Sequence, residues 1–138
     1  MRLYSVSGKL ISKNVAKYRI KWDGKSRSNI QFEVKQFLKK YWFSHIVYEE
    51  FPVYGSRMKV DFVNATRKIA VEVNGAQHGA FNKFFHNNSR SKYLSSIRRD
   101  YEKYEWLIKN NFQVLEIEDS DLKTLSPSYI KERFDIEI

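Results

Sequence analysis

The sequence predicts an α/β fold, a mixed β-sheet flanked by helices in the element order α-β-β-β-α-β-α. Three observations support it: two long stretches with apolar residues at helical spacing, two short apolar strands joined by a polar turn, and a further strand after the second helix. The 138 residues are 42% hydrophobic and 16% aromatic, so the chain can bury one core and is too apolar for a disordered chain. We expect a basic, partly stranded extension at residues 1–28 and a core domain at residues 29–138.

The first helix is predicted from Asn29 to Tyr41. Ser28 and Gln31 have the spacing of a capping box, in which two side chains satisfy backbone N–H groups at the start of the helix. A second helix is predicted over residues 91–111, with an apolar stripe that we expect to be buried. The stripe consists of Leu94, Ile97, Tyr101, Tyr104, Leu107 and Ile108. Pro127 is expected to open a short last helix, because proline favours the first helical position.

Strands are predicted where apolar and polar residues alternate, or where short apolar runs end in turns. Residues 18–22 of the extension alternate in this way. Residues 45–54 predict an edge strand broken at Pro52, because proline lacks the N–H that a central strand needs. Residues 110–118 predict a turn and then a strand. We expect this strand to run parallel to its neighbour, since the long helix before it provides a crossover.

The stretches "MKVDFV" and "KIAVEVN" predict a hairpin whose register can be derived. If its loop runs over residues 65–68, facing residues have numbers that sum to 133, so Val60 faces Val73 and Phe62 faces Val71. One side of the hairpin is then wholly apolar. A slip of one residue would scatter these side chains over both faces, which favours this register.

The other side of the hairpin brings Asp61 opposite Glu72, and Lys59 opposite Asn74. Facing Cβ atoms lie about 5 Å apart, so the two carboxylates meet on one surface. Bridged by a divalent cation, they form a hard oxygen site suited to magnesium or manganese. His78 follows the strand closely enough to reach the same ion or its water. The alternative interpretation is an ordinary acid pair on a solvent-facing sheet.

Two helical acids and one aromatic loop have two interpretations each. Glu33 in the first helix and Asp100 in the second either join the polar site or lie in solvent. The phenylalanines between residues 81 and 85 either pack beneath their loop or stack on bases. No chemistry is assigned to His45 or His86.

The net charge of +9 is unevenly distributed. Residues 1–31 hold eight basic residues against Asp23 alone, and residues 83–103 add a second basic group. This asymmetry suggests a face built for a polyanion, with nucleic acid as the leading candidate, and leaves a merely well-solvated basic surface as the alternative. The residues expected to grip nucleic acid are Lys17, Arg19, Lys21, Lys25, Arg27, Lys83, Arg90, Lys92, Arg98 and Arg99.

Other classes of protein are not expected. The absence of cysteine excludes disulfides and thiolate metal sites, and fits a reducing cytoplasm. No apolar run approaches the roughly 20 residues that span a bilayer, and the first residues do not have a signal-peptide pattern. We therefore expect a cytoplasmic protein without a membrane partner.

Five elements in order carry a resemblance to a known family. They are the helix with Glu33, then "KVDFV", "IAVEVNGAQH", the helix with "RRDYEK", and "NNFQVLEI". Together they resemble the PD-(D/E)XK nuclease superfamily over residues 29–122. The resemblance is closest to the branch of very-short-patch-repair (Vsr)-like endonucleases, which includes the phage-associated EDxHD homing endonucleases. It implies a restriction-endonuclease-like sheet, and a bacterial or phage-infected cell as the setting.

The resemblance also implies roles for residues that match the family's motifs. The helix glutamate falls on Glu33, the metal-binding strand aspartate on Asp61, and the later helix aspartate on Asp100. The histidine that assists water or the leaving group falls on His78. Glu72 matches the acidic residue of the wider superfamily. The implied cofactor is magnesium, held by Asp61 and Glu72, with manganese able to substitute.

The chain departs from the superfamily at Asn74, where a lysine is usual. Asparagine can neither act as a base nor carry positive charge. We expect either Lys59, opposite Asn74 in the predicted register, or His78 to supply the missing function.

The resemblance therefore implies a magnesium-dependent DNA endonuclease of the Vsr-like or homing type. A Holliday-junction or branched-DNA resolvase on the same core is the alternative within the enzyme class. A DNA-binding module on a degenerate nuclease core is the alternative outside it. A homodimer would provide two active sites for cutting both strands.

Overall fold

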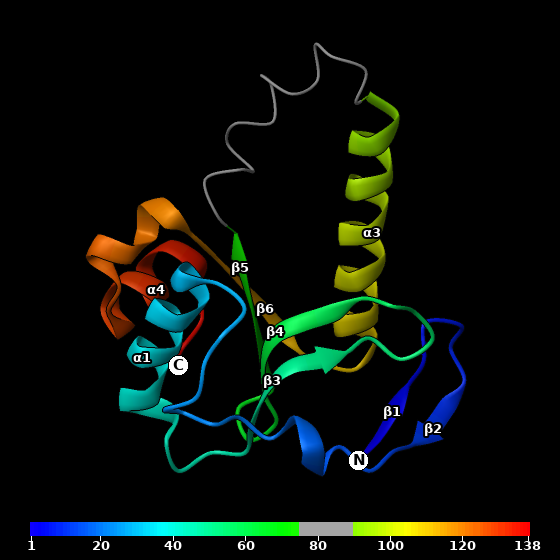
Figure 1. Ribbon diagram of the computed structural model, residues 1–138, viewed down its shortest axis with the longest axis horizontal. Coiled ribbons are helices and arrows are strands. Elements are labelled where there is room, and N and C mark those ends of the chain that lie inside the picture. The colour runs from blue at the N-terminus through cyan, green and yellow to red at the C-terminus, as the bar shows by residue number, and fades with distance from the viewer. Residues whose placement is uncertain (75–89) are drawn as a thin grey trace.

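The computed structural model describes residues 1–74 and 90–138. Its centre is a four-stranded mixed sheet, shown in Figure 1. From one edge to the other the strands are β3 (Val47–Pro52), β4 (Lys59–Asn64), β5 (Ile69–Asn74) and β6 (Gln113–Glu118). The first three are antiparallel to one another and β6 runs parallel to β5. The α/β class, the hairpin, the edge strand ending at Pro52 and the parallel last strand are thus confirmed.

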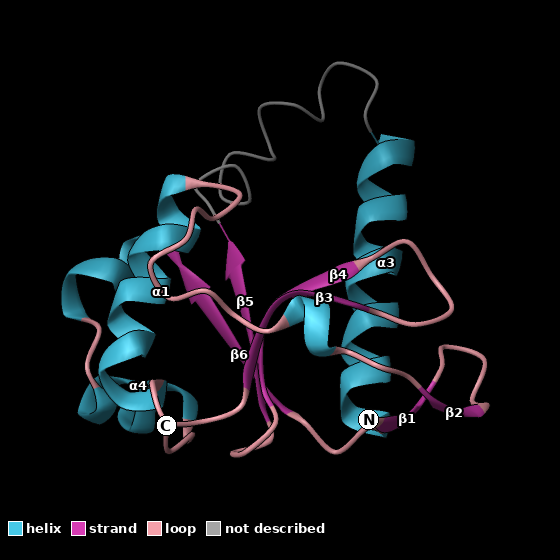
Figure 2. Cartoon of the chain, turned by 60° about the horizontal axis from the view of Figure 1, so that its bottom comes forward, coloured by secondary structure: helices cyan, strands magenta, loops and turns pink. Residues whose placement is uncertain are grey.

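Helices cover both faces of the sheet. They are α1 (Asn29–Trp42), α3 (Arg90–Lys109) and α4 (Pro127–Phe134), with a 3-10 segment η2 (Asp119–Thr124) before α4. Figure 2 shows α1 and α4 on one side of β5 and β6, with α3 on the other. The α1 core joins Leu38, Trp42 and Ile130 to the sheet, and the α3 core joins Trp106 and Leu107 to its opposite face.

The predicted start of α1 is confirmed, although its capping box is one-sided. The Ser28 hydroxyl accepts a hydrogen bond from the backbone N–H of Gln31 at 3.2 Å. The Gln31 side chain does not return the bond, because its Nε2 donates to Glu49 on β3 at 2.9 Å. The buried polar contact between helix and sheet thus takes the place of the second half of the box.

Replacing Ser28 by alanine is expected to lower the free energy of unfolding by about 1 kcal/mol, because one N–H of the first turn loses its acceptor. Urea unfolding followed by circular dichroism measures this change. Ser28→Asp is the control, since aspartate also accepts from the first turn and should retain most of the stability.

The strands of the N-terminal segment lie at other positions than predicted. The segment forms a small hairpin, β1 (Arg2–Tyr4) and β2 (Leu10–Ser12), and a 3-10 turn η1 (Ala16–Tyr18). The strand predicted over residues 18–22 is wrong, because only Arg19 bridges to Tyr48 before the chain turns away from β3. The hairpin is tied to α3, since the Trp106 indole N–H donates to the Tyr4 carbonyl at 2.6 Å.

The predicted register holds for only half of the hairpin. Phe62 pairs with Val71, but the ladder between β4 and β5 extends no further toward the end of β5. The predicted pair of Val60 and Val73 is wrong: Val60 packs in the α3 core and Val73 in the α1 core.

A local backbone conformation accounts for this change of face. Glu50 in β3 has a left-handed φ of 52°, and the ladder between β3 and β4 omits the pairing of Glu50 with Asp61. Beyond this point the side-chain alternation changes phase, so Phe51 and Val60 both face the α3 core. Strict alternation, which the prediction assumed, fails where a strand is kinked in this way.

The prediction that α3 buries its apolar stripe is also wrong. Leu94, Ile97, Tyr101, Tyr104 and Ile108 are between 45% and 63% exposed. Of the predicted stripe, Leu107 alone is fully buried, next to Trp106. The reason is that α3 packs through its last turns, and Figure 1 shows its first half extending past the end of the sheet. Within the described part of the chain, no helix is long and apolar enough to cross a membrane.

Candidate functional site

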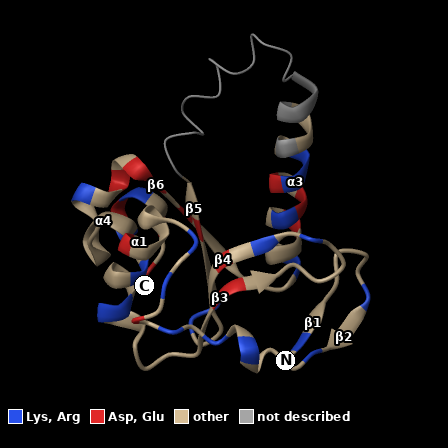
Figure 3. Ribbon diagram, in the orientation of Figure 1, with Lys and Arg blue, Asp and Glu red and all other residues tan. Residues whose placement is uncertain are grey.

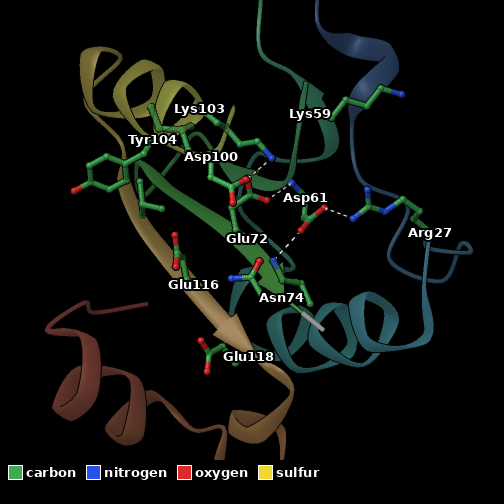
Figure 4. Close-up of a pocket in the computed structure, with 13 residues that line it drawn as sticks. Arg27, Lys59, Asp61, Glu72, Asn74, Asp100, Lys103, Tyr104, Glu116 and Glu118 are labelled. Atoms are coloured by element: carbon green, nitrogen blue, oxygen red, sulfur yellow. Dashed lines mark hydrogen bonds and ion pairs between the residues drawn. The ribbon is translucent and has the colours of Figure 1, made fainter. Parts of the chain in front are cut away.

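A polar pocket of about 320 Å³ lies between α3 and the face of β4, β5 and β6 (Figure 4). It brings together five of the predicted site residues, which are Lys59, Asp61, Glu72, Asn74 and Asp100. The pocket also contains Arg27, which was predicted only to contact DNA. Its other charged or polar residues had no predicted site role, and they are Lys103, Tyr104, Glu116 and Glu118.

Asp61 lies where β4 and β5 separate. Its side chain is buried, with the residue only 4% exposed. One carboxylate oxygen, Oδ2, accepts the backbone N–H of Val73 at 2.8 Å, so the side chain replaces a peptide group that the ladder would otherwise provide. The other oxygen, Oδ1, is 3.3 Å from Nη2 of Arg27. The strand kink therefore fixes this carboxylate at the floor of the pocket.

Glu72 is the second carboxylate of the floor. Its Oε1 is 2.7 Å from the ammonium of Lys103 on α3, and its Oε2 accepts the backbone N–H of Asp61 at 3.4 Å. Burial raises the pKa of Glu72 to about 8, the negative charge of Asp61 adds to this effect, and Lys103 opposes it. A buried glutamate that resists ionisation beside the carboxylate of Asp61 provides a strong electrostatic reason to bind a cation.

The parallel register of β5 and β6 adds two further acids. It places Glu72 beside Glu116 and Asn74 beside Glu118. Neither was among the predicted site residues, although aligning "AVEVN" with "VLEIE" as parallel neighbours would have revealed them. With Asp61 and Asp100, the pocket has five carboxylates against the three cations Arg27, Lys59 and Lys103. This is a net acidic pocket in a chain of net charge +9.

Lys103 is the lysine that contacts Glu72 in the pocket. Lys103 is the last residue of the motif "RRDYEK", and it was not among the predicted site residues. Lys59 is exposed, and Figure 4 shows its side chain pointing away from Glu72 and Asn74. The predicted cross-strand pair of Lys59 with Asn74 is absent from the register of β4 and β5.

Other predicted residues lie elsewhere. Glu33 is exposed on α1 and does not line the pocket. His78, Lys83, His86 and the loop phenylalanines fall outside the described residues, as do the side chains of Arg90 and Lys92. His45 has a structural contact, because its Nδ1 is 3.0 Å from the amide nitrogen of Asn64.

A basic hollow adjoins the acidic pocket and shares four of its residues. It is lined by Arg27, Glu50, Arg57, Met58, Lys59, Arg99, Asp100 and Lys103. Five cations against two acids make it a suitable surface for a phosphate backbone. Of the residues predicted to grip DNA, Arg27 and Arg99 lie here, and Arg57 is an addition. Lys17, Lys21, Lys25 and Arg98 are exposed, and Arg19 lines a separate hollow near the N-terminus. Figure 3 shows that basic residues occur both in the N-terminal segment and on α3.

The donor set of the pocket fits a hard divalent cation. Magnesium is commonly bound by one or two carboxylates together with water and substrate phosphate. Asp61 and Glu72 provide two such carboxylates in this pocket. No set of three or more acidic or histidine side chains able to hold a metal occurs among the described residues. The remaining ligands would thus have to come from water, from a backbone carbonyl or from the substrate.

Comparison with known proteins shows a partial similarity to a viral protein. No family model matches the chain, and no solved structure matches it. The chain is 35% identical over 66 residues to "Uncharacterized protein 033L" of Invertebrate iridescent virus 3. The match covers 48% of this chain and 34% of the viral protein, so the chain spans about a third of that relative's length. This similarity assigns neither a family nor an activity.

Proposed function

We propose that the protein is a magnesium-dependent DNA endonuclease that hydrolyses phosphodiester bonds. The observation that carries the proposal is the acidic pocket beside the basic hollow. A phosphate backbone lying on Arg27, Arg57 and Arg99 would meet the five carboxylates only if a cation neutralised them. Metal binding and DNA binding at adjoining surfaces are what a metal-dependent nuclease requires.

Asp61 and Glu72 would hold the ion. When bound, a divalent cation would polarise the scissile phosphate and increase the acidity of water beside it. The N–H of Val73 keeps the Asp61 carboxylate oriented into the pocket, and Lys103 keeps that of Glu72 oriented. Both carboxylates are therefore preorganised by contacts within the protein. This limits the reorganisation needed when ion and phosphate arrive.

Lys103 would supply the positive charge that the superfamily places at the position of Asn74. Its ammonium already lies in the pocket, 2.7 Å from Glu72, and its side chain is 19% exposed. From there it can orient Glu72 and stabilise negative charge that develops on the phosphate. Lys59 also lines the pocket but points to solvent, so the same role would require a different rotamer.

Replacing Lys103 by methionine is expected to slow cleavage about 100-fold, the usual scale for losing one group that stabilises developing charge. Lys59→Met is the matched control, because it removes the same charge from the same pocket and should slow cleavage only about two- to threefold through weaker DNA binding. Single-turnover cleavage at saturating protein separates the two effects. Equal losses in both variants would argue against a specific role for Lys103.

The function itself is tested with supercoiled plasmid and a synthetic four-way junction, each with magnesium, manganese or EDTA. Metal-dependent nicking supports the nuclease, and a strong preference for the junction would indicate a resolvase instead of a Vsr-like or homing-type enzyme. Salt-sensitive binding without cleavage under every metal condition would refute the proposal and leave a DNA-binding module.

A further inference from the structure

An exposed apolar stripe runs along α3. Leu94, Ile97, Tyr101, Tyr104 and Ile108 succeed one another at intervals of three, four, three and four residues, the a and d positions of a heptad repeat. On a helix this spacing makes a straight seam about 20 Å long. Such a seam is the surface that a second helix covers in a coiled coil.

Among the described residues, the stripe belongs to neither core. Trp106 and Leu107 face the α3 core and Lys103 faces the pocket, whereas the helical period puts the stripe on roughly the opposite side of α3. All five side chains are exposed by 45% or more. Figures 1 and 2 both show that the other described elements leave the first half of α3 uncovered. Contiguous exposed apolar side chains of this kind mark an interaction surface.

We propose that the stripe is the interface of a homodimer in which two copies of α3 pack antiparallel. A second copy of the chain carries the same seam with the same period, so a twofold axis brings each stripe onto the other. With the axis near residues 102 and 103, Tyr101 faces Tyr104 of the second copy, and Ile97 faces its Ile108. The inference is independent of the nuclease activity.

Charges beside the stripe select the antiparallel direction. Arg98 and Glu105 both occupy e positions of the heptad, and Asp100 occupies a g position. In an antiparallel pair, e positions meet e positions, so Arg98 of each copy lies near Glu105 of the other. In a parallel pair, g meets e, which would bring Asp100 near Glu105 twice. Opposite charges thus attract in the first arrangement and like charges repel in the second.

The interface is small, so the dimer is expected to be weak. Five apolar residues from each copy fall at the low end of interface sizes, where complexes are transient. The acidic pocket would stay accessible, because only Tyr104 belongs to both the stripe and the pocket, and Figure 4 shows it pointing away from Asp61 and Glu72.

Sedimentation equilibrium of the full chain from about 1 to 200 μM provides the first test, since micromolar association would be visible over this range. We expect a reversible monomer–dimer equilibrium that Ile97→Glu abolishes. Ser95→Glu is the matched control, because it adds the same charge to the same turn away from the stripe and should dimerise like the unchanged protein. A monomer at every concentration would overturn the proposal. So would a monomer that Ile97→Glu destabilises, because the chain itself would then cover the stripe.

Charge reversal tests the direction. Glu105→Arg should weaken an antiparallel dimer about tenfold by opposing Arg98, and the double change Arg98→Glu with Glu105→Arg should restore it. The same single change would strengthen a parallel dimer by attracting Asp100, which would overturn the proposed arrangement.

Cysteine cross-linking provides an independent readout, because the chain has no cysteine of its own. In the antiparallel pair the two copies of residue 94 are about 25 Å apart along the helix, whereas a parallel pair brings them together. Leu94→Cys should therefore form no disulfide dimer under oxidation, and Tyr101→Cys should form one. Efficient cross-linking through Leu94→Cys would contradict the antiparallel arrangement.

Discussion

Asp61→Asn is expected to reduce magnesium-dependent cleavage by about 10³-fold or more, the scale for removing a group that organises charge in the transition state. Asparagine keeps the shape of the side chain, and its amide oxygen can take the place of Asp61 Oδ2 as acceptor of the Val73 N–H. The substitution therefore removes a negative ligand without opening a cavity at the separation of β4 and β5. Plasmid nicking with magnesium measures the loss, and thermal unfolding verifies that the fold is retained.

Glu33→Gln is the matched control for this change. The family resemblance gives Glu33 a role, yet the structure places it exposed on α1 and outside the pocket. Removing one carboxylate there should leave cleavage within about twofold, because an exposed side chain contributes little unless it contacts the substrate. Equal losses in Asp61→Asn and Glu33→Gln would show that the site extends to α1. Unchanged cleavage in Asp61→Asn would rule out the proposed magnesium site.

The pKa of Glu72 predicts that magnesium binding depends strongly on pH. The carboxyl must lose its proton to bind the ion, and its pKa is raised to about 8 by burial and by Asp61. Below that pH, magnesium has to displace a proton, so its apparent affinity should rise close to tenfold per pH unit between about pH 6 and 8. Calorimetric titration in buffers of different ionisation enthalpy would detect the released proton.

The same group makes the metal-free protein less stable as the pH rises. The pKa of Glu72 is about 8 in the folded state against an ordinary value of 4.5, so between these values the folded state binds more protons than the unfolded state. The free energy of unfolding should then fall by up to about 1.4 kcal/mol per pH unit across this range. The stabilisation is complete below pH 4.5 and is lost as the pH passes 8. Glu72→Gln should remove both pH dependences, and their persistence in that variant would assign them to another group.

Most of the fold could be predicted from the sequence because its signals are local. The cap at Ser28, the helical spacing of α1 and the turn between β4 and β5 each depend on a few neighbouring residues, and all three are confirmed. The long helix before β6 was sufficient to predict a parallel strand. Period and turn chemistry specify such features without reference to tertiary contacts.

The errors arose where tertiary structure overrides periodicity. The left-handed conformation of Glu50 changes the side-chain alternation of β3 and β4. The sequence does not predict this conformation, since glutamate rarely adopts it. The stripe on α3 has the period of a buried face, but period alone does not reveal whether the covering partner is the same chain. The first error came from assuming that side chains alternate strictly along β4 and β5. The second came from assuming that the same chain buries the apolar stripe of α3.

The candidate site shows the same division. Asp61, Glu72 and Asp100 were predicted and line one pocket, since alternation on β4 and β5 placed the first two on the polar side. Glu116 and Lys103 were missed, because each comes from an element brought alongside only by the crossover. Strand alignment could have revealed Glu116. The contact of Lys103 with Glu72 depends on how α3 is rotated about its axis against the sheet. The prediction that the apolar stripe is buried implied a different rotation.

The acidic lining of the pocket has a consequence for how such a protein could search DNA without harming it. Backbone phosphates held on the basic hollow would be repelled by the neighbouring carboxylates whenever no divalent ion is present. A protein bound through the hollow could therefore slide along a chromosome while its reactive groups stay disengaged. Cleavage would require a bound divalent ion and a DNA backbone bent into the pocket at the same time. Scanning would then be frequent and cutting rare, a useful safeguard for any cell that carries the protein.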